Sequence, residues 1–379
     1  MRTITKLLLF ATIFLSMNAC GNKQEKTACE AQQTTEFRLG TGVNVSHWLS
    51  QSELRGAERE QLITKKDFDS IAAMGFEHVR LPIDEVQLYD EAMNRHEDAF
   101  RLMHNAIEWT LENGMNIIVD LHIIRSHHFN SENGENTLFE KAEEQEKMIR
   151  IWLDLQKDLA KYPTDRVAYE LMNEAVAPTD EDWNKLIAKL ISSIREQEPE
   201  RKIVVGSNLW QTVETFANLR VPEDDKNLIL SFHFYYPLVV THYRAWWTGL
   251  KDFTGVVNYP GQAIDTALYA TLPPALVAEI RKSNGVWNKE RLAATMKPAI
   301  DKAKEFNLPL YCGEFGAYPA YLDKEVRLRW YRDIAAIFRE NNINNAHWCY
   351  KGDFPVVNAD GSRNELPAIL LGKEKRLEI

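Results

Sequence analysis

Polar or aromatic side chains stand at the ends of most strand-like runs of this 379-residue sequence. The run Val167–Ala175 is rich in β-forming and aromatic residues and leads into Asn173 and Glu174. An unpaired buried charge costs much free energy, so this pair is expected to face a working cleft. Glu314 stands at the end of a later run. The other strand-end residues are Arg80, His122, His233, Tyr235 and Trp348.

Two glutamates at such positions indicate glycoside hydrolysis. This chemistry needs one protonated carboxyl, which donates to the leaving oxygen, and one ionised carboxylate, which attacks the anomeric carbon. Arg80 and the hydroxyl of Tyr235 near Glu314 would keep it ionised, because an opposite charge and hydrogen bonds lower a carboxyl pKa. His233 near Glu174 would tune the acid or hold the sugar. We therefore expect Glu174 and Glu314 to act as a pair.

The elements that must position these residues alternate from residue 37 onward. Strand-like runs cover 42–45, 78–82, 116–122, 167–175, 202–206, 228–233, 309–314 and 345–350, and helical patterns cover 65–74, 100–112, 140–160, 181–196, 289–306 and 325–340. Near-continuous apolar strands alternating with helices predict an α/β fold, a parallel sheet closed into a (β/α)8 TIM barrel. An open doubly wound sheet is the alternative, but no glycine-rich phosphate loop follows the first strand.

In such a barrel the carboxyl ends of all strands meet on one face, where active sites are built. Any one of the strand-end residues could have a purely structural role. Together, at one level of the barrel, they predict an active site. Glu170 shares a strand face with Glu174, and we expect it to pair with a buried cation such as Arg80 as support rather than as a catalyst.

Composition and charge exclude several classes of function. The hydrophobic content of 45% and charged content of 26% are those of a globular protein. A formal charge of −10 argues against a nucleic-acid partner. Four cysteines are no disulfide framework. Cys312 and Cys349 are expected to be small core residues, with a bridge between them as the alternative.

The N-terminal segment is expected to lie outside the fold. A basic start, a short apolar run and Cys20 predict a signal peptide over residues 1–20, with Cys20 as a lipidated N-terminus and simple secretion as the alternative. Residues 21–36 are typical of a flexible tether, and residues 37–379 form the predicted catalytic domain. The expected location is the outer membrane or cell surface, or the periplasm, and the expected state is a monomer.

The ordered set Arg80, His122, Asn173-Glu174, His233-Phe234-Tyr235, Glu314 and Trp348 resembles glycoside hydrolase family 5, the cellulase family A, over roughly residues 37–379. The resemblance implies that Glu174 is the acid/base and Glu314 the nucleophile. It implies that Asn173 holds the sugar 2-hydroxyl, that Trp348 forms the floor, and that the remaining residues support them. Ala175 departs from the proline that many relatives have there. Retention of configuration follows, with carboxyl groups about 5–5.5 Å apart.

The substrate is expected to be a polysaccharide or oligosaccharide, with β-1,4-glucan and an endoglucanase activity favoured on family frequency. A β-mannanase and an exo-acting β-glucosidase are the alternatives. The long insertion 235–288 would offer aromatic platforms for sugars or, equally, form a small core of its own. Its aromatic residues include Tyr236, Tyr243, Trp246, Trp247, Phe253, Tyr259 and Trp287. The loop with Arg125, His127 and His128 is expected to form the opposite wall.

Two rival classes of function differ in chemistry. A metal-dependent hydrolase would use His122, His233 and a carboxylate, but the ligand spacing of such sites is missing. We therefore expect no metal and no cofactor. A noncatalytic glycan-binding lipoprotein would not need two carboxylates, yet both Glu174 and Glu314 are present.

Overall fold

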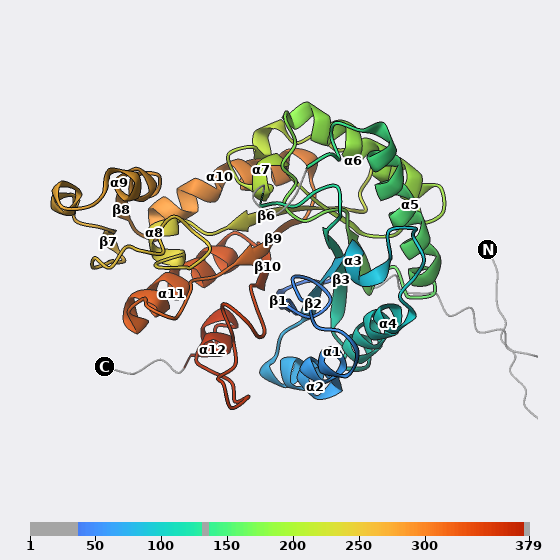
Figure 1. Cartoon of the computed structure of the whole chain (residues 1–379), viewed down its shortest axis with the longest axis horizontal. Helices are drawn as coiled ribbons and strands as arrows, with labels where there is room; N and C mark the ends of the chain where they lie inside the picture. The colour runs from blue at the N-terminus through green and yellow to red at the C-terminus, as the bar shows by residue number, and fades with distance from the viewer. Residues whose placement is uncertain (1–36, 131–135, 375–379) are drawn as a thin grey trace, which may run out of the picture. The chain divides into compact units, whose positions relative to one another are not determined.

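The computed structural model describes residues 37–130 and 136–374, which belong to one compact unit. Its centre is a closed barrel of parallel strands in the order β1-β10-β9-β6-β5-β4-β3-β2 (Figure 1). The strands are β1 (Thr41–Asn44), β2 (His78–Asp84), β3 (Asn116–Ile123), β4 (Val167–Glu170), β5 (Ile203–Gly206), β6 (Leu228–Phe234), β9 (Leu310–Phe315) and β10 (Asn344–His347). The predicted TIM barrel is confirmed. The predicted signal peptide and tether, with Cys20, lie outside the described residues.

Helices surround the barrel (Figure 1). The long ones are α2 (Lys65–Met74), α4 (Glu97–Glu112), α5 (Ala142–Leu159), α6 (Asp180–Arg195), α10 (Lys289–Phe306) and α11 (Lys324–Glu340). The short ones are α1 (Gly56–Leu62), α3 (Glu85–Leu88), α7 (Asn208–Gln211), α8 (Leu238–Thr241), α9 (Pro274–Arg281) and α12 (Leu366–Leu370). Between β5 and β6 the described chain forms only α7 and a 3-10 turn at Phe216–Asn218, so no long helix connects these two strands.

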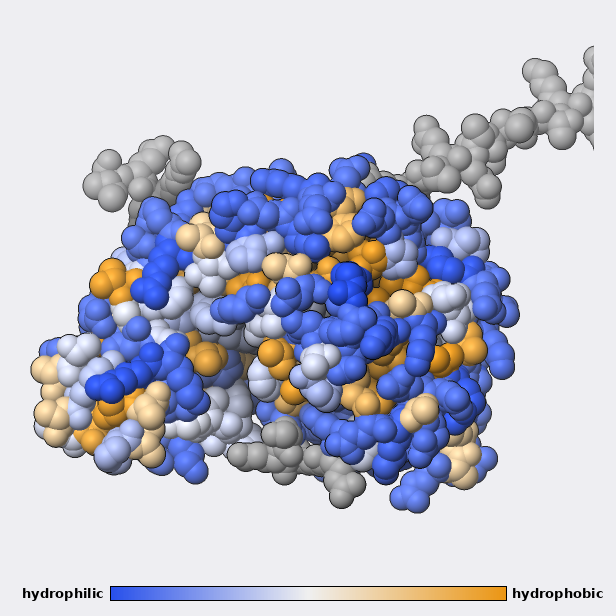
Figure 2. Space-filling model, turned by 90° about the horizontal axis from the view of Figure 1, so that it is seen from above, coloured by the Kyte–Doolittle hydropathy of each residue, from blue (hydrophilic) through white to orange (hydrophobic). Residues whose placement is uncertain are grey.

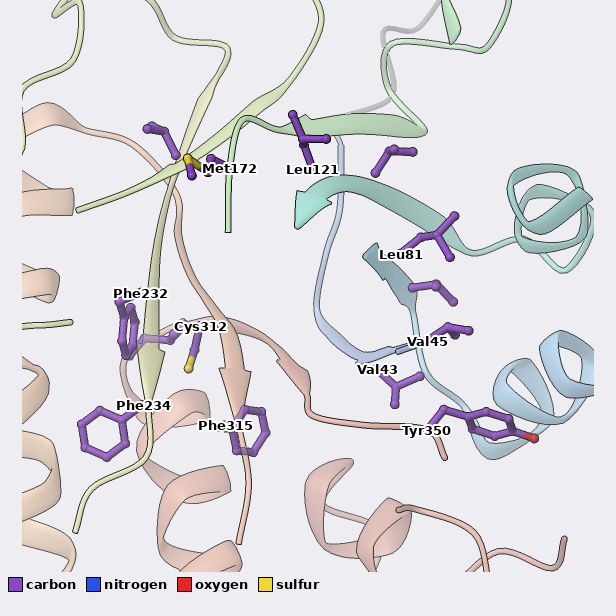
Figure 3. Close-up of a cluster of buried hydrophobic side chains, with 14 of the residues drawn as sticks. Val43, Val45, Leu81, Leu121, Met172, Phe232, Phe234, Cys312, Phe315 and Tyr350 are labelled. Carbon is purple, nitrogen blue, oxygen red and sulfur yellow. The ribbon is translucent and has the colours of Figure 1, made fainter. Parts of the chain in front are cut away.

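Side-chain alternation along the strands separates two cores. Side chains such as Leu81, Leu121 and Phe232 belong to the large cluster that also includes buried residues of the helices (Figure 3). A second cluster combines Ile118, Ala168, Val204, Ile229, Tyr311 and Ala346 from neighbouring strands. Because successive side chains of a strand face opposite sides, these belong to the barrel interior. Polar side chains of the same strands follow toward the carboxyl ends.

Two predicted strands are too long. β4 ends at Glu170, so Asn173 and Glu174 lie beyond it. Glu174 has a φ of +42°, a left-handed conformation that no regular strand contains. β10 ends at His347, so Trp348 follows the strand rather than closing it. Asn173, Glu174 and Trp348 therefore lie on the segments just beyond these strands.

The insertion after β6 contains α8, α9 and a two-stranded antiparallel sheet of β7 (Gly261–Gln262) and β8 (Val286–Trp287). Most of its aromatic residues are buried: Tyr243, Phe253, Tyr259 and Trp287 belong to the large core. Trp246, by contrast, is 71% exposed. The insertion lies at the left of Figure 2, where hydrophobic residues reach the surface. Of the two expected uses of these aromatics, core packing accounts for the larger share.

Two further expectations concern single residues. Cys312 and Cys349 are buried and unbridged, so they are core residues. The loop after β3, expected to form the opposite wall of the site, places the ring of Phe129 5.6 Å from that of His122, but two of the residues named for this wall have other partners. His127 is fully buried, and Arg125 donates to Glu85 and to the carbonyl of Tyr89.

No described helix is long and apolar enough to cross a membrane.

Candidate active site

Arg80 on β2 is the centre of a fully buried charge cluster. Its Nε donates to Glu170 Oε2 over 2.6 Å, its Nη1 to Glu314 Oε1 over 2.7 Å, and its Nη2 lies 3.0 Å from Asp120 Oδ2. Nη2 also donates to Asn173 Oδ1 over 2.9 Å. Paired, hydrogen-bonded charges are what burial in a barrel requires. The expected pairing of Glu170 with Arg80 is confirmed.

Glu314 lies on β9, within the barrel wall. Arg80 binds one of its carboxylate oxygens, and the hydroxyl of Tyr235 donates to the other over 3.0 Å. Tyr235 follows directly after β6, the strand that pairs with β9. Both oxygens of Glu314 therefore have fixed partners, which set the orientation of the carboxylate.

Glu174 has different surroundings. Its Oε1 lies 2.8 Å from His233 Nδ1, which is 3.7 Å from the nearer oxygen of Glu314. Burial and the charge of Arg80 lower the pKa of His233 well below its ordinary value, so the imidazole is neutral. His233 thus binds Glu174 without adding a positive charge.

The two glutamates differ in proton affinity. Burial and then the charge of Glu314 raise the pKa of Glu174 well above its ordinary value. Burial also raises the pKa of Glu314, and Arg80 is the main group that opposes it. Arg80 lowers the pKa of Glu314 as expected, but burial outweighs the guanidinium, so the net shift is upward. Since Arg80 contacts Glu314 and not Glu174, a proton shared by the pair resides on Glu174.

Trp348 and His122 form an adjacent wall. Their rings stack with centroids 5.6 Å apart and planes 10° apart. His122 Nδ1 lies 2.7 Å from Asp120 Oδ2, and its Nε2 lies 2.9 Å from Gln51 Nε2. Burial lowers the pKa of His122 to about 3, so it is a neutral, fixed side chain. The structure thus places every strand-end residue singled out from the sequence around one site.

The comparisons with known proteins agree with this arrangement. A family model described as cellulase, glycosyl hydrolase family 5, matches residues 32–353. The chain belongs to glycosyl hydrolase family 5. Endoglucanase C of Acetivibrio thermocellus is 33% identical over 326 residues, covering 84% of this chain and 93% of that protein. Cellodextrinase A of Ruminococcus flavefaciens is 28% identical over 307 residues, covering 80% and 83%.

Solved structures share the fold of this family 5 chain. A hyperthermophilic endo-β-1,4-glucanase solved with substrate superposes with a TM-score of 0.72 at 24% identity, covering 88% of this chain and 97% of that one. Cel5A of Thermotoga maritima superposes with a TM-score of 0.70 at 23% identity, covering 88% and 97%. At these identities the likeness concerns the barrel, not the substrate.

A metal centre of the kind considered from the sequence is not assembled in this family 5 site. Among the described residues, Glu174, His233 and Glu314 are one group whose ligand atoms lie within 4.8 Å of one another. His122 is not a member, since its ring nitrogens face Asp120 and Gln51. The oxygens of Glu314 are already bound by Arg80 and Tyr235. The set of His122, His233 and a carboxylate considered from the sequence is therefore not the group that the structure brings together.

Several residues of this family 5 site were missed from the sequence. Asp120 stands two residues before His122 on the same strand face, so the period of two could have found it. Asn44 on β1 accepts from Arg80 Nη1 over 2.9 Å. Gln51 comes from a loop and Gln211 from the end of α7, where Leu209 and Trp210 have non-helical backbone angles, and no pattern in the sequence marks either glutamine.

Proposed function

We propose that this protein is a retaining endo-β-1,4-glucanase that works by double displacement. The observation that carries the proposal is the pair of Glu174 and Glu314 in unlike surroundings. One oxygen of each lies within 4.8 Å of the other and of His233. This separation suits retaining enzymes, whose carboxyl groups lie about 5–5.5 Å apart, and not inverting ones, which need about 6.5–9.5 Å.

In the first step Glu314 attacks the anomeric carbon and forms a glycosyl ester. Glu174 donates its proton to the glycosidic oxygen as that bond breaks, so the leaving sugar departs as a neutral alcohol. Arg80 and Tyr235 hold the carboxylate of Glu314 in the attacking orientation. Because its pKa is raised well above the ordinary value, Glu174 retains the proton that it donates.

In the second step Glu174 changes from acid to base, because Glu314 no longer carries a negative charge. Glu314 is neutral in the ester. Its negative charge, which had raised the pKa of Glu174, is therefore absent in this step. Glu174 can then act as a base, accepting a proton from the water that attacks the anomeric carbon. Glu314 leaves as a carboxylate, and the configuration at the anomeric carbon is retained.

The other residues orient the sugar. Asn173, anchored to Arg80, would hold the 2-hydroxyl of the sugar undergoing attack. Trp348, stacked on His122, would form the floor beneath it, because sugars present apolar C–H faces to aromatic rings.

The names of the relatives favour glucan as the substrate. The similar proteins that cover most of this chain are called endoglucanase and cellodextrinase. Cel5A of Thermotoga maritima was solved with mannotriose as well as with cellobiose. A β-mannanase or an exo-acting β-glucosidase therefore stays the alternative for this chain.

A polysaccharide panel tests the substrate and the mode of action. We expect carboxymethyl cellulose to lose viscosity faster than reducing ends accumulate, which an endo-acting enzyme produces. Proton NMR of the first product should show the β-anomer. Release of the α-anomer would exclude retention, and cleavage of mannan alone would move the substrate to the mannanase alternative. Binding of glycan without any cleavage would favour the noncatalytic rival.

We also propose that the chain is exported and anchored through a lipid on Cys20. Residues 1–36, with the apolar run and the cysteine, are the support for this. The full-length protein expressed in a Gram-negative bacterium should partition into detergent, and Cys20→Ser should release it into the aqueous phase. Equal partitioning of both forms would contradict the anchor. Size-exclusion chromatography of residues 37–379 tests the predicted monomer.

A further inference from the structure

The backbone at Glu174 needs support from outside its own segment. Its φ of +42° lies in the left-handed region, which side-chain-bearing residues rarely adopt. It also lies beyond β4, and the backbone bond to a neighbouring strand just before it is that of the Asn173 N–H to the carbonyl of Leu121, over 3.1 Å. The direction in which its carboxyl leaves the chain depends on this backbone conformation. Something adjacent must hold the N–H and carbonyl groups of this turn.

Gln211 makes that contact. The N–H of Glu174 donates to Gln211 Oε1 over 3.2 Å, and Gln211 Nε2 donates to Glu170 Oε1 over 3.3 Å. The Gln211 side chain is 1% exposed, so water does not replace these bonds. Glu170 is in turn bound by Arg80, which also binds Glu314. One amide thus connects the backbone of Glu174 to the charge cluster that holds Glu314.

The segment after β5 that includes α7, called here the loop after β5, holds this amide in place through an unusual backbone conformation. Leu209, Trp210 and Gln211 have φ values of +54°, +62° and +54°, three left-handed residues in succession. The Trp210 N–H donates to the carbonyl of Ala175 over 3.2 Å, so the two loops are also joined by their backbones. A Cβ added to Gly206 would lie 2.3 Å from the Gln211 side chain, so a larger residue there would displace it.

The absence of a long helix between β5 and β6 in the described chain allows this arrangement. Asn208 exchanges two hydrogen bonds with Ala177: the Ala177 N–H donates to Asn208 Oδ1 over 2.8 Å, and Asn208 Nδ2 donates to the Ala177 carbonyl over 3.1 Å. The loop after β5 therefore lies along the turn that carries Glu174. Its three left-handed residues are tolerated because these contacts fix them.

We propose that Gln211 is a positioning residue for the acid/base. Its amide sets the backbone of Glu174, and through it the placement of the carboxyl at the leaving oxygen. The inference rests on the proposed role of Glu174 but goes beyond it, because it makes proton delivery by Glu174 depend on a residue that touches no reacting atom. A merely structural glutamine would affect the stability of the protein and the hydrolysis of every substrate alike.

The test compares Gln211→Met with Gln156→Met. Methionine keeps the length of the side chain and removes its hydrogen bonds. Gln156 on α5 is similarly buried, at 3% exposure, and donates to the carbonyl of Ile194 on α6 over 3.0 Å, a contact that involves no residue of the site. Both variants lose hydrogen bonds of a buried amide, and only one of them lies beside Glu174.

The readout is kcat/KM, which reports the glycosylation step, on two substrates. One is an unactivated cello-oligosaccharide, and the other is a dinitrophenyl β-cellobioside, whose leaving group needs no proton. Gln211→Met should lose about tenfold on the first, the scale of one hydrogen bond, and less than about twofold on the second. Gln156→Met should leave both values unchanged and lower only the melting temperature.

Gly206→Ala provides a second, independent variant. It leaves the Gln211 amide chemically intact but displaces it, so the same selective loss is expected. It also keeps the test open if Gln211→Met folds poorly. Equal losses on both substrates, or no loss on either, would overturn the proposal. Glu174→Ala, measured in parallel, separates the two claims: if it shows no leaving-group dependence, the acid assignment itself is wrong, whatever Gln211 does.

Discussion

The two glutamates of the site are held by different means. Glu314 lies on β9, where strand pairing fixes its backbone and Arg80 and Tyr235 fix its carboxylate. Glu174 lies beyond β4 with a left-handed backbone, and the side chain of Gln211 from the next loop holds its N–H. The position of Glu314 is therefore a property of the barrel, while the position of Glu174 is a property of the loops.

The same contrast applies to charge. Arg80 binds Glu314 directly, whereas the nearest side-chain nitrogen of Glu174 belongs to His233, which is neutral. A group that must stay ionised contacts a permanent cation, and a group that must carry a proton does not. Substitutions on the two sides should therefore separate attack on the sugar from proton transfer.

The largest expected effect is that of Glu314→Ala. Removing the attacking carboxylate should reduce turnover by several orders of magnitude, on unactivated and activated substrates alike, because no glycosyl ester can form. Steady-state rates on both substrates measure this, and glycan binding by calorimetry should persist as the control for folding. Substantial activity on either substrate would remove Glu314 from the nucleophile role.

Glu174→Ala should show the opposite dependence on the leaving group. Its kcat/KM on cello-oligosaccharides should fall by about 10²–10⁴, the range of general acid catalysis, and far less on a dinitrophenyl glycoside. Added azide should raise turnover of the activated substrate, because it attacks the ester without needing a base. If both substrates lose the same factor, Glu174 is not the acid.

Tyr235→Phe should cost less, about 10–10²-fold in kcat. The change removes the hydroxyl that donates to Glu314 Oε2 but leaves Arg80 in place. Tyr236→Phe is the matched control, because the neighbouring hydroxyl donates to the exposed Glu214 instead. Similar kinetics for the two variants would show that the Tyr235 hydrogen bond does not hold the nucleophile.

The smallest effect is a change in titration. Burial and then the charge of Glu314 raise the pKa of Glu174. Glu314→Gln removes this negative charge and leaves the burial, so the pKa of Glu174 should fall toward its ordinary value. Carbon-13 NMR titration of the Glu174 carboxyl measures the shift directly. An unchanged or higher pKa would show that the two carboxyls are not coupled.

The sequence predicted the barrel and the strand-end residues because each signal is local. Apolar runs mark the strands, and a parallel barrel brings their ends together whatever the loops do. His122, His233 and Glu314 each stand at the end of such a run.

What the sequence could not predict depends on loops. The strand at Val167 was expected to continue through Glu174. It ends earlier because Glu174 adopts a left-handed backbone, and a glutamate in the sequence does not indicate this conformation. Gln211 lies in a segment without periodicity, and its role depends on how two loops meet. The aromatic residues of the insertion looked alike in the sequence, yet Trp287 is buried and Trp246 is exposed. Tertiary contacts alone decide between these outcomes.

The charge cluster around Arg80 has a consequence for the evolution of thermal tolerance. A barrel selected only for stability would fill this level with apolar side chains, since buried ion pairs are often no more stabilising than hydrophobic residues of similar volume. Here Asp120, Glu170 and Glu314 are all taken out of water beside one guanidinium. The charged side chains that catalysis requires at these positions are thus not the ones that would give the greatest thermal stability. Heat-resistant descendants of this chain must gain their stability elsewhere, in the helices and surface loops that surround the barrel.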